Sequence, residues 1–199
     1  MSVKFEFRKL ARETLRSSGA DWAEIGLAIG ARLRAMAEVQ SADLLTAYCA
    51  LAEEPVLTEF CKTWLASGKG LCLPRFDSAA RCYRMALVGD LQSDLCPGKF
   101  GILEPCPDLP EPEPELLRRN TVWLVPGLAF SLDGVRLGRG GGYYDRLLAD
   151  VSGWKLGVAA DCQLLPRLPR EEHDVLMDCL VTEDRLLRLH NDKTPPSLT

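Results

Sequence analysis

The sequence contains only two histidines among its 199 residues, and its eight cysteines include no C-x-x-C pair. Zinc sites combine cysteine and histidine at recognisable spacings, so no zinc site is expected. The chain is also too long and too poor in cysteine to resemble a small disulfide scaffold. Cys72 lies in the apolar stretch "GLCLPRF", where a thiol packs like a small hydrophobic group. We therefore expect reduced thiols in the core or near the surface.

Long apolar runs and an excess of positive charge are also missing. No run approaches the length of about 18 residues or more that a membrane span needs. The first residues, "MSVKFEFRKLARETL", alternate charged and apolar side chains and contain no hydrophobic core of a signal peptide. The net charge of -4 argues against a general nucleic-acid binder, which would present a basic face. We expect a cytoplasmic protein with neither a membrane nor a nucleic acid as partner.

The length and the 47% content of hydrophobic residues indicate one domain with a substantial core. We expect this domain to cover residues 1–190, to act as a monomer, and to be followed by a disordered tail over residues 191–199.

The pattern of apolar residues predicts helices alternating with strands. Helices are expected over residues 3–17, 21–39 and 55–69. Strands are expected over residues 44–50, 70–76, 82–89 and 155–160, and residues 121–130 are expected to form a central strand followed by a turn at Pro126-Gly127. A last short strand within 175–184 precedes a helical end. This alternation is typical of a mainly parallel sheet with helices on both faces.

One segment is rich in proline. Residues 96–114 hold six of the 13 prolines. Proline lacks a backbone N–H and fixes φ, so we expect an extended surface loop here rather than a sheet interior. For the same reason, Pro74 is expected to end the strand that begins at residue 70.

The most unusual stretch is "RLGRGGGYYDR", residues 136–146. Four glycines would destabilise a helix, and two tyrosines do not suit a flexible linker. The stretch follows an expected strand and precedes an expected helix, and ligands of open α/β sheets bind beyond the carboxyl ends of strands. Glycines let the backbone approach phosphate oxygens, and Arg136 and Arg139 add forked donors. The pattern indicates a site for a small anion.

Two common phosphate motifs are excluded by spacing. No Gly-Lys-Ser/Thr is present for a Walker A loop, and counting from Gly138 gives Gly140 and then Tyr143 where G-x-G-x-x-G requires a third glycine. A glycine-rich turn with solvated arginines remains an alternative. Asp145 has its own alternative, since an acid in a first helical turn is favourable without a ligand.

A longer stretch around this cluster, "VPGLAFSLDGVRLGRGGGYYDRLLA" at residues 125–149, closely resembles the signature of the 5-formyltetrahydrofolate cyclo-ligase family, also called methenyltetrahydrofolate synthetases. Weaker pieces agree in order: "RKLAR", "EEPVLTEF", "CLPRF", "GILEP" and "DCQLLPRLPREEHDVLMDCLVTE". The resemblance covers about residues 5–187.

The resemblance implies a three-layer α/β/α fold related to sugar-phosphate isomerases and CoA transferases. It also implies an enzyme that uses ATP and Mg²⁺ to convert 5-formyltetrahydrofolate into 5,10-methenyltetrahydrofolate, with ADP and phosphate released. In this reaction the formyl oxygen is phosphorylated before the second bridging nitrogen attacks the formyl carbon.

Site residues are carried over from the resemblance by position. The implied ATP-binding residues are Arg8, Arg12, Arg136, Leu137, Gly138, Arg139, Gly140, Gly141, Gly142, Tyr143 and Tyr144. The implied folate-binding residues are Cys49, Glu54, Arg139, Gly140, Gly141, Gly142 and Tyr143. Asp145 and Asp174 resemble the two magnesium-associated carboxylates, in keeping with the preference of Mg²⁺ for oxygen ligands.

Several of these residues have plainer interpretations. Arg8 and Arg12 are four positions apart and share a helix face. A basic face exposed to solvent would explain both residues without a ligand. Glu54 is otherwise an exposed loop acid, and Cys49 would serve in packing rather than as a nucleophile. His173 is interpreted as a structural or surface residue. The family usually has lysine where Arg8 stands and often where Gly141 stands.

Three functions therefore compete. The first is the cyclo-ligase, and the second is an isomerase or CoA transferase, which would need a differently placed glutamate and not Asp145 with Asp174. The third is a non-catalytic relative that binds folate or nucleotide, which the substitution at Arg8 leaves open. The loop over residues 96–114 is a candidate lid over the folate.

Overall fold

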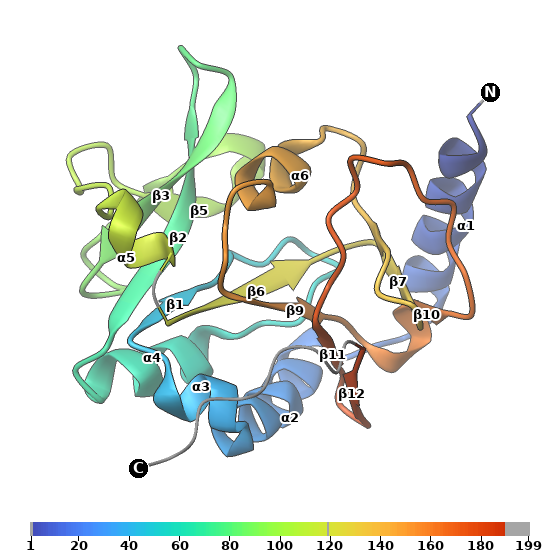
Figure 1. Cartoon of the computed structure of the whole chain (residues 1–199), viewed down its shortest axis with the longest axis horizontal. Helices are drawn as coiled ribbons and strands as arrows, with labels where there is room; N and C mark the ends of the chain where they lie inside the picture. The colour runs from blue at the N-terminus through green and yellow to red at the C-terminus, as the bar shows by residue number, and fades with distance from the viewer. Residues whose placement is uncertain (1, 119, 190–199) are drawn as a thin grey trace.

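The computed structural model describes residues 2–118 and 120–189 (Figure 1). The predicted tail, residues 191–199, lies outside the described residues. Within the described residues, no helix is both long and apolar enough to cross a membrane.

The centre of the described structure is a sheet with the strand order β12-β11-β9-β6-β1-β2-β3 (Figure 1). Its strands are β1 (Leu44–Thr46), β2 (Gly70–Asp77), β3 (Cys82–Val88), β6 (Thr121–Pro126), β9 (Trp154–Val158), β11 (Cys179–Val181) and β12 (Leu186–Arg188). Neighbours from β11 to β2 run parallel, and only the edge strands β3 and β12 are antiparallel. The expected mainly parallel sheet is confirmed.

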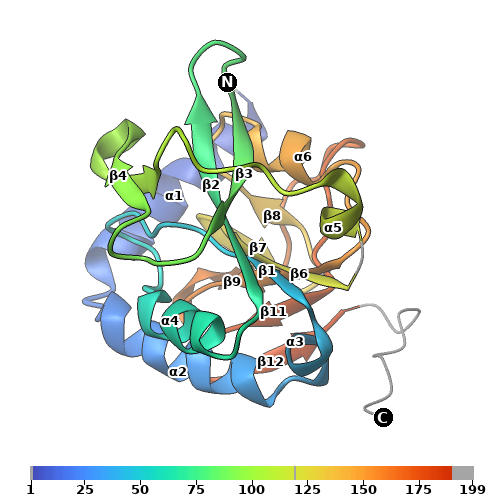
Figure 2. The same cartoon turned by 90° about the vertical axis from the view of Figure 1, so that its left-hand side faces the viewer.

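Helices cover both faces of this sheet (Figures 1 and 2). On one face lie α2 (Trp22–Ala35), α3 (Ala37–Ser41) and α4 (Thr58–Ala66), and on the other lie α5 (Pro114–Arg118) and α6 (Tyr143–Leu148). One apolar cluster, with Ile29 and Leu33 of α2, fills the first interface, and a second, with Trp123 and Leu148, fills the other. The expected three layers follow from these two cores.

Residues 21–39 form two helices rather than one. Asp21 caps α2, with its side chain accepting from the backbone N–H groups of Ala23 and Glu24. Met36 then adopts an extended conformation, with φ -80° and ψ 130°, and its N–H bonds to the carbonyl of Leu33. This one residue ends α2 before α3 begins.

Strand β2 continues through Pro74 to Asp77, so the expectation that Pro74 ends this strand is wrong. The partner strand β1 stops at Thr46, opposite Cys72, whereas β3 pairs with β2 as far as Asp77. Pro74 therefore stands where β2 has a neighbour on one side only, which is a position that tolerates proline. Beyond this point β2 and β3 project from the body as a two-stranded ribbon (Figure 2).

The proline-rich segment is more ordered than a plain loop. It contains β4 (Leu95–Pro97), the short 3-10 helix η1 (Lys99–Gly101) and β5 (Leu103–Pro105), with β4 and β5 antiparallel. A disulfide joins Cys96 to Cys106, whose Cα atoms lie 5.2 Å apart. The expectation that all cysteines are reduced thiols is wrong for this pair, because the hairpin brings together two cysteines that the sequence separates.

The N-terminal helix α1 (Val3–Ser17) lies outside the main layers (Figure 1). It packs through Ala11 and Leu15 against a small sheet of β10 (Leu164–Leu165), β7 (Ala129–Ser131) and β8 (Arg136–Leu137). The expected central strand is β6, which ends at Pro126 where the turn was expected, and β7 follows that turn. A second short 3-10 helix, η2 (Asp161–Gln163), precedes β10. After residue 184, where a helix was expected, the described residues form the antiparallel strand β12 instead.

Candidate functional site

A cavity of about 570 Å³ opens at the carboxyl ends of the central strands. Tyr48 and Cys49 follow the end of β1, while Pro126 and Gly127 lie at the end of β6, and all four line the cavity. The cavity therefore lies at the edge of the sheet where α/β folds bind ligands.

Nearly all residues implied by the resemblance line this cavity. They are Arg8, Cys49, Glu54, Arg136, Leu137, Gly138, Arg139, Gly140, Gly141, Gly142, Tyr143, Tyr144, Asp145 and Asp174. Arg12 is not among the lining residues, and Lys4, one turn before Arg8 on α1, is.

The glycine loop, residues 138–142, joins β8 to α6 and forms the floor between the two sides of the cavity. Gly140 and Gly142 have φ values of 105° and 62°, in the region that favours glycine. Arg8 Nε donates to the Gly138 carbonyl at 3.0 Å, so α1 is tied to this loop. The following helix α6 has only six residues.

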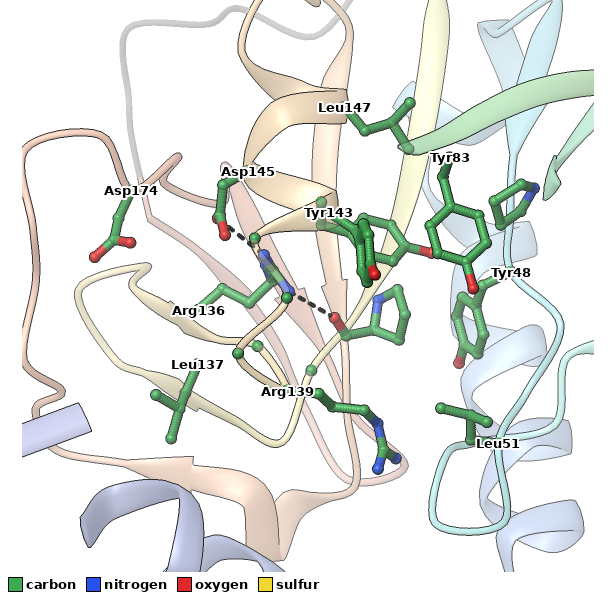
Figure 3. A pocket seen from close by; sticks show the side chains of 18 of the residues that line it. Tyr48, Leu51, Tyr83, Arg136, Leu137, Arg139, Tyr143, Asp145, Leu147 and Asp174 are labelled. Carbon is green, nitrogen blue, oxygen red and sulfur yellow. Dashed lines mark hydrogen bonds and ion pairs between the residues drawn. The ribbon is translucent and has the colours of Figure 1, made fainter. Parts of the chain in front are cut away.

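One side of the cavity is charged (Figure 3). The Arg136 side chain is 4% exposed and donates from Nη2 to Asp145 Oδ1 at 2.9 Å. Its guanidinium also lies 5.3 Å from the centre of the Tyr144 ring, within cation–π range. Arg136 Nε is buried and has no hydrogen-bond partner among the described residues. Asp145 and Tyr144 thus anchor the Arg136 side chain, and its Nε–H remains without an acceptor among the described residues.

Lys4 and Asp174 form a second ion pair on this charged side. Lys4 Nζ donates to the two Asp174 carboxylate oxygens at 2.8 and 2.7 Å and to Glu171 Oε2 at 3.0 Å. Burial acts to lower the pKa of Lys4, but hydrogen bonds to both acids outweigh it and raise the pKa. Burial likewise opposes ionisation of Asp174, but the Glu171 N–H and the Lys4 ammonium hold its pKa below the ordinary value.

The same acids form a candidate metal cluster. Ligand atoms of Glu171, His173 and Asp174 lie within 4.8 Å of one another, and Asp145 lies on the same side of the cavity (Figure 3). His173 is exposed, as expected, with Nε2 3.3 Å from Glu171. The carboxylates of Asp145 and Asp174 suit Mg²⁺, which combines one or two carboxylates with water and phosphate oxygens.

The opposite side is aromatic and apolar (Figure 3). Phe76, Tyr83 and Tyr143 meet edge to face, with ring centres 5.2 to 5.9 Å apart. Tyr48 is buried here, and its hydroxyl donates to the Pro55 carbonyl at 2.8 Å. Tyr48, Tyr83 and Tyr143 line the cavity and offer flat apolar surfaces to a planar heterocycle, whereas Phe76 packs against Tyr83 and Tyr143 without lining it.

Glu54 is the charged group of this aromatic side. It is 5% exposed, accepts from the Leu51 N–H at 3.0 Å and pairs with Arg139 at 3.2 Å. Burial raises its pKa, against the lowering effects of the Leu51 N–H and Arg139. Burial also raises the pKa of the Cys49 thiol to about 12. Cys49 therefore stays protonated at neutral pH, and a nucleophilic thiolate is not available.

Sequence reasoning missed Lys4, Tyr48 and Tyr83, all of which line the cavity. For Lys4 the signal was present, since Lys4 and Arg8 are four positions apart on α1 just as Arg8 and Arg12 are. Tyr48 and Tyr83 lie near the ends of two different strands that only the fold brings together. Nothing in the sequence around either tyrosine therefore indicates that it lines the cavity.

Comparison with known proteins gives consistent results. The sequence profile of the 5-formyltetrahydrofolate cyclo-ligase family matches residues 2–183. A 5-formyltetrahydrofolate cyclo-ligase of Mycolicibacterium smegmatis is 35% identical over 143 residues, which are 70% of this chain and 73% of that protein. One of Escherichia coli K12 is 36% identical over 126 residues, 62% of this chain and 68% of that protein.

Two solved structures share the fold. The 5,10-methenyltetrahydrofolate synthetase of Aquifex aeolicus has a TM-score of 0.80 at 33% identity, covering 98% of this chain and 97% of its own. The synthetase of Mycoplasma pneumoniae has a TM-score of 0.68, covering 92% of this chain and 99% of its own. At 18% identity, the second shows likeness of fold alone.

Proposed function

This chain belongs to the 5-formyltetrahydrofolate cyclo-ligase family, and on that premise we propose that it converts 5-formyltetrahydrofolate into 5,10-methenyltetrahydrofolate at the expense of ATP. The observation that carries the proposal is the division of one cavity into a charged side and an aromatic side, joined by the glycine loop. A phosphoryl group must pass from a highly charged ligand to a largely aromatic one, and this arrangement holds both against the same loop.

The charged side receives the ATP phosphates. Lys4 and Arg8 project from one face of α1, and Arg136 comes from β8. We propose that Lys4 and Arg8 form the basic pair, in place of Arg8 and Arg12, because Lys4 lines the cavity and Arg12 does not. Lys4 also supplies a lysine on this helix, which weakens the reason for considering a non-catalytic relative. The backbone N–H groups of the glycine loop are further donors, and its glycines have no side chain to keep a phosphate away from them.

Asp145 and Asp174 fit a magnesium ion through their oxygen donors. Each carboxylate is paired with a cation, Asp145 with Arg136 and Asp174 with Lys4. Mg²⁺, when bound, neutralises phosphate charge as the phosphoryl group transfers. Arg136 and Lys4 would then donate to the phosphates while still paired with their carboxylates, which places positive charge where negative charge develops.

The aromatic side receives the folate. Glu54 lies buried, with Oε2 bonded to the Leu51 N–H and Oε1 to Arg139, and Oε1 could accept from amino and amide N–H groups of a pterin once Arg139 moves away. Arg139, whose side chain is 37% exposed, would leave Glu54 and turn toward the second ligand. Tyr143 lies at the end of the glycine loop, beside both ligands, and its ring offers a stacking surface.

The proposed reaction proceeds in two steps. The formyl oxygen attacks the terminal phosphorus of ATP, and the bond from this phosphorus to ADP breaks. The second bridging nitrogen of the folate then attacks the formyl carbon, its proton leaves, and the carbon–oxygen bond to phosphate breaks. No side-chain nucleophile is required, so positioning and charge stabilisation supply most of the rate.

The test uses the purified chain with 5-formyltetrahydrofolate, Mg²⁺ and ATP, and follows the near-ultraviolet absorbance of the methenyl product. We expect product only when all three are present and none when a non-hydrolysable ATP analogue replaces ATP. Tight binding of both ligands without product would contradict the proposal and favour a non-catalytic binding protein. Isomerisation of a sugar phosphate would instead favour the isomerase, which was the second of the three competing functions.

We further propose that the enzyme is a monomer in the cytoplasm. Elution at the mass of one chain in size-exclusion chromatography, and recovery with the soluble fraction after cell lysis, are the expected results. A dimer at micromolar concentration, or recovery with membranes, would contradict this part of the proposal.

A further inference from the structure

Glu104, in β5, is a buried acid with half of its acceptor capacity unused. Glu104 is 5% exposed, and Oε2 accepts from the backbone N–H of Phe76 at 3.0 Å. Oε1 is buried and has no partner at full hydrogen-bond geometry among the described residues, although a side-chain hydrogen bond with Glu104 is one of the causes that raise the pKa of Tyr83. A carboxylate oxygen removed from water without a donor is costly, so its retention in a folded protein calls for a physical reason.

The hairpin of β4 and β5 fixes Glu104 in this place. Glu104 pairs with Cys96 across the hairpin, and the disulfide from Cys96 to Cys106 closes the same segment. Gly98 covers the Glu104 side chain so closely that a Cβ at Gly98 would lie 2.5 to 2.7 Å from three Glu104 side-chain atoms. The acid therefore cannot swing out toward Gly98 and solvent.

Tyr83 is the cross-strand partner of Phe76, whose N–H is bonded to Glu104, so the fold places Tyr83 beside this acid. Glu104 is close enough to act on both the Tyr83 hydroxyl and the Cys49 thiol, since after burial its charge is the next cause that raises the pKa of each to about 12. A phenol O–H is a much better donor than a thiol. Tyr83 is therefore the natural partner for Oε1.

Tyr83 is also the aromatic residue of the cavity whose ring position Glu104 can most directly fix. Its ring centre lies 5.3 Å from that of Phe76 and 5.2 Å from that of Tyr143, both nearly edge to face. Glu104 already holds the backbone of Phe76 through Oε2. One carboxylate thus bonds the backbone of Phe76 and lies beside Tyr83, and of the three rings in this cluster Tyr83 and Tyr143 line the cavity.

Resting on the proposed function, we propose that Glu104 is a positioning residue of the folate side: its Oε1 accepts the Tyr83 hydroxyl and thereby holds the Tyr83 ring in place against the ring system of 5-formyltetrahydrofolate. Glu104 is not among the residues that line the cavity, so it acts through Tyr83 rather than by touching the folate. The ATP side contains neither residue, and its binding should not depend on them.

The test is a double-mutant cycle of Glu104→Gln and Tyr83→Phe. The glutamine keeps one oxygen for the Phe76 N–H and turns an amide donor toward Tyr83, while the phenylalanine keeps the ring and removes the hydroxyl. We expect each variant to raise KM for 5-formyltetrahydrofolate about 10-fold, equal to about 1.4 kcal/mol, with KM for ATP unchanged. The double variant should be no worse than either single one, because both remove the same contact.

Matched controls separate this role from general damage. Glu59→Gln removes an exposed acid that pairs with Lys62 on α4, and we expect native kinetics. Multiplicative effects in the double variant, near 100-fold, would show that the two residues act independently and would overturn the inference. A matching rise in KM for ATP would indicate a merely structural role and would overturn it as well.

The inference and the proposed function fail in different ways. If the wild-type chain makes no methenyl product, the proposed function is contradicted, and the same cycle is then measured as the dissociation constant for 5-formyltetrahydrofolate by calorimetry. If the wild-type chain is active but both single variants keep native KM, the inference alone is contradicted. Should Glu104→Gln fail to fold, a native folate KM in Tyr83→Phe suffices to overturn it.

Discussion

Replacing Arg136 with alanine tests the charged side of the cavity most directly. The Arg136 side chain is 4% exposed and is bonded to Asp145, whose side chain is 23% exposed. Removing one partner of a buried ion pair costs about 3–5 kcal/mol, and partial hydration of Asp145 reduces this to roughly 2–3 kcal/mol. For a chain of this size, that lowers the Tm by roughly 5–10 °C.

The catalytic effect of the same change should be larger. We propose that Arg136 turns toward the phosphate in the transition state, and loss of one such donor commonly costs about 100-fold or more in kcat. Arg136→Lys keeps the charge but loses the fork that bonds Asp145 and phosphate together, so its rate should fall between those of wild type and Arg136→Ala.

The assay follows methenyl product at saturating folate and ATP, well below the Tm of each variant, with calorimetry for stability. Arg84→Ala is the matched control, since this arginine is half exposed on the projecting ribbon and pairs with Asp77 and Glu111. A kcat within threefold of wild type for Arg136→Ala would refute the reasoning and leave Arg136 with a purely structural role.

Three further results are expected. Asp174→Asn should raise the Mg²⁺ concentration for half-maximal activity about 10-fold or more, because one oxygen ligand loses its charge. Gly26→Ala should lower stability by about 3 kcal/mol, measured as Tm, since a Cβ at this helix position would lie 2.0 Å from the Val56 carbonyl oxygen. Burial raises the pKa of Cys61 and Cys72 from 9.0 to about 12. The folded chain therefore keeps these protons longer than the unfolded chain, and the free energy of unfolding should fall as pH rises from 9 toward 12.

Each of these results has a clear contrary outcome. An unchanged Mg²⁺ dependence in Asp174→Asn would remove Asp174 from the metal site. A native Tm for Gly26→Ala would mean that the backbone at Val56 moves away from the added methyl group at little cost in free energy. Rapid alkylation of Cys61 and Cys72 in the native chain at pH 8, at the rate of exposed Cys162, would show that their burial is transient.

Much of the fold was predictable because its strands carry strong local signals. The run that forms β6 is apolar throughout, and the fully buried central strand of a parallel sheet requires such a run. The errors occur where a distant partner decides the outcome. Pro74 stays in β2 because β1 ends early, and Cys96 finds Cys106 because β4 and β5 pair.

The site was predictable to the extent that one contiguous motif supplies it. The glycine loop and Asp145 lie together in the chain, and both line the cavity. The choice between Lys4 and Arg12 on α1 was not predictable from helical spacing, since each lies one turn from Arg8. It depends on Asp174, a residue from the other end of the chain that meets only one of them.

The ion pair between Lys4 and Asp174 determines when, during synthesis on the ribosome, this side of the cavity can form. The two residues are separated by 170 positions, and the ribosome adds residues at about 5–20 per second. For roughly 10–30 s after it leaves the exit tunnel, the first helix therefore has no carboxylate to receive its ammonium. We expect a nascent chain of any intermediate length to bind neither ATP nor folate, so binding capacity arises only when synthesis nears its end.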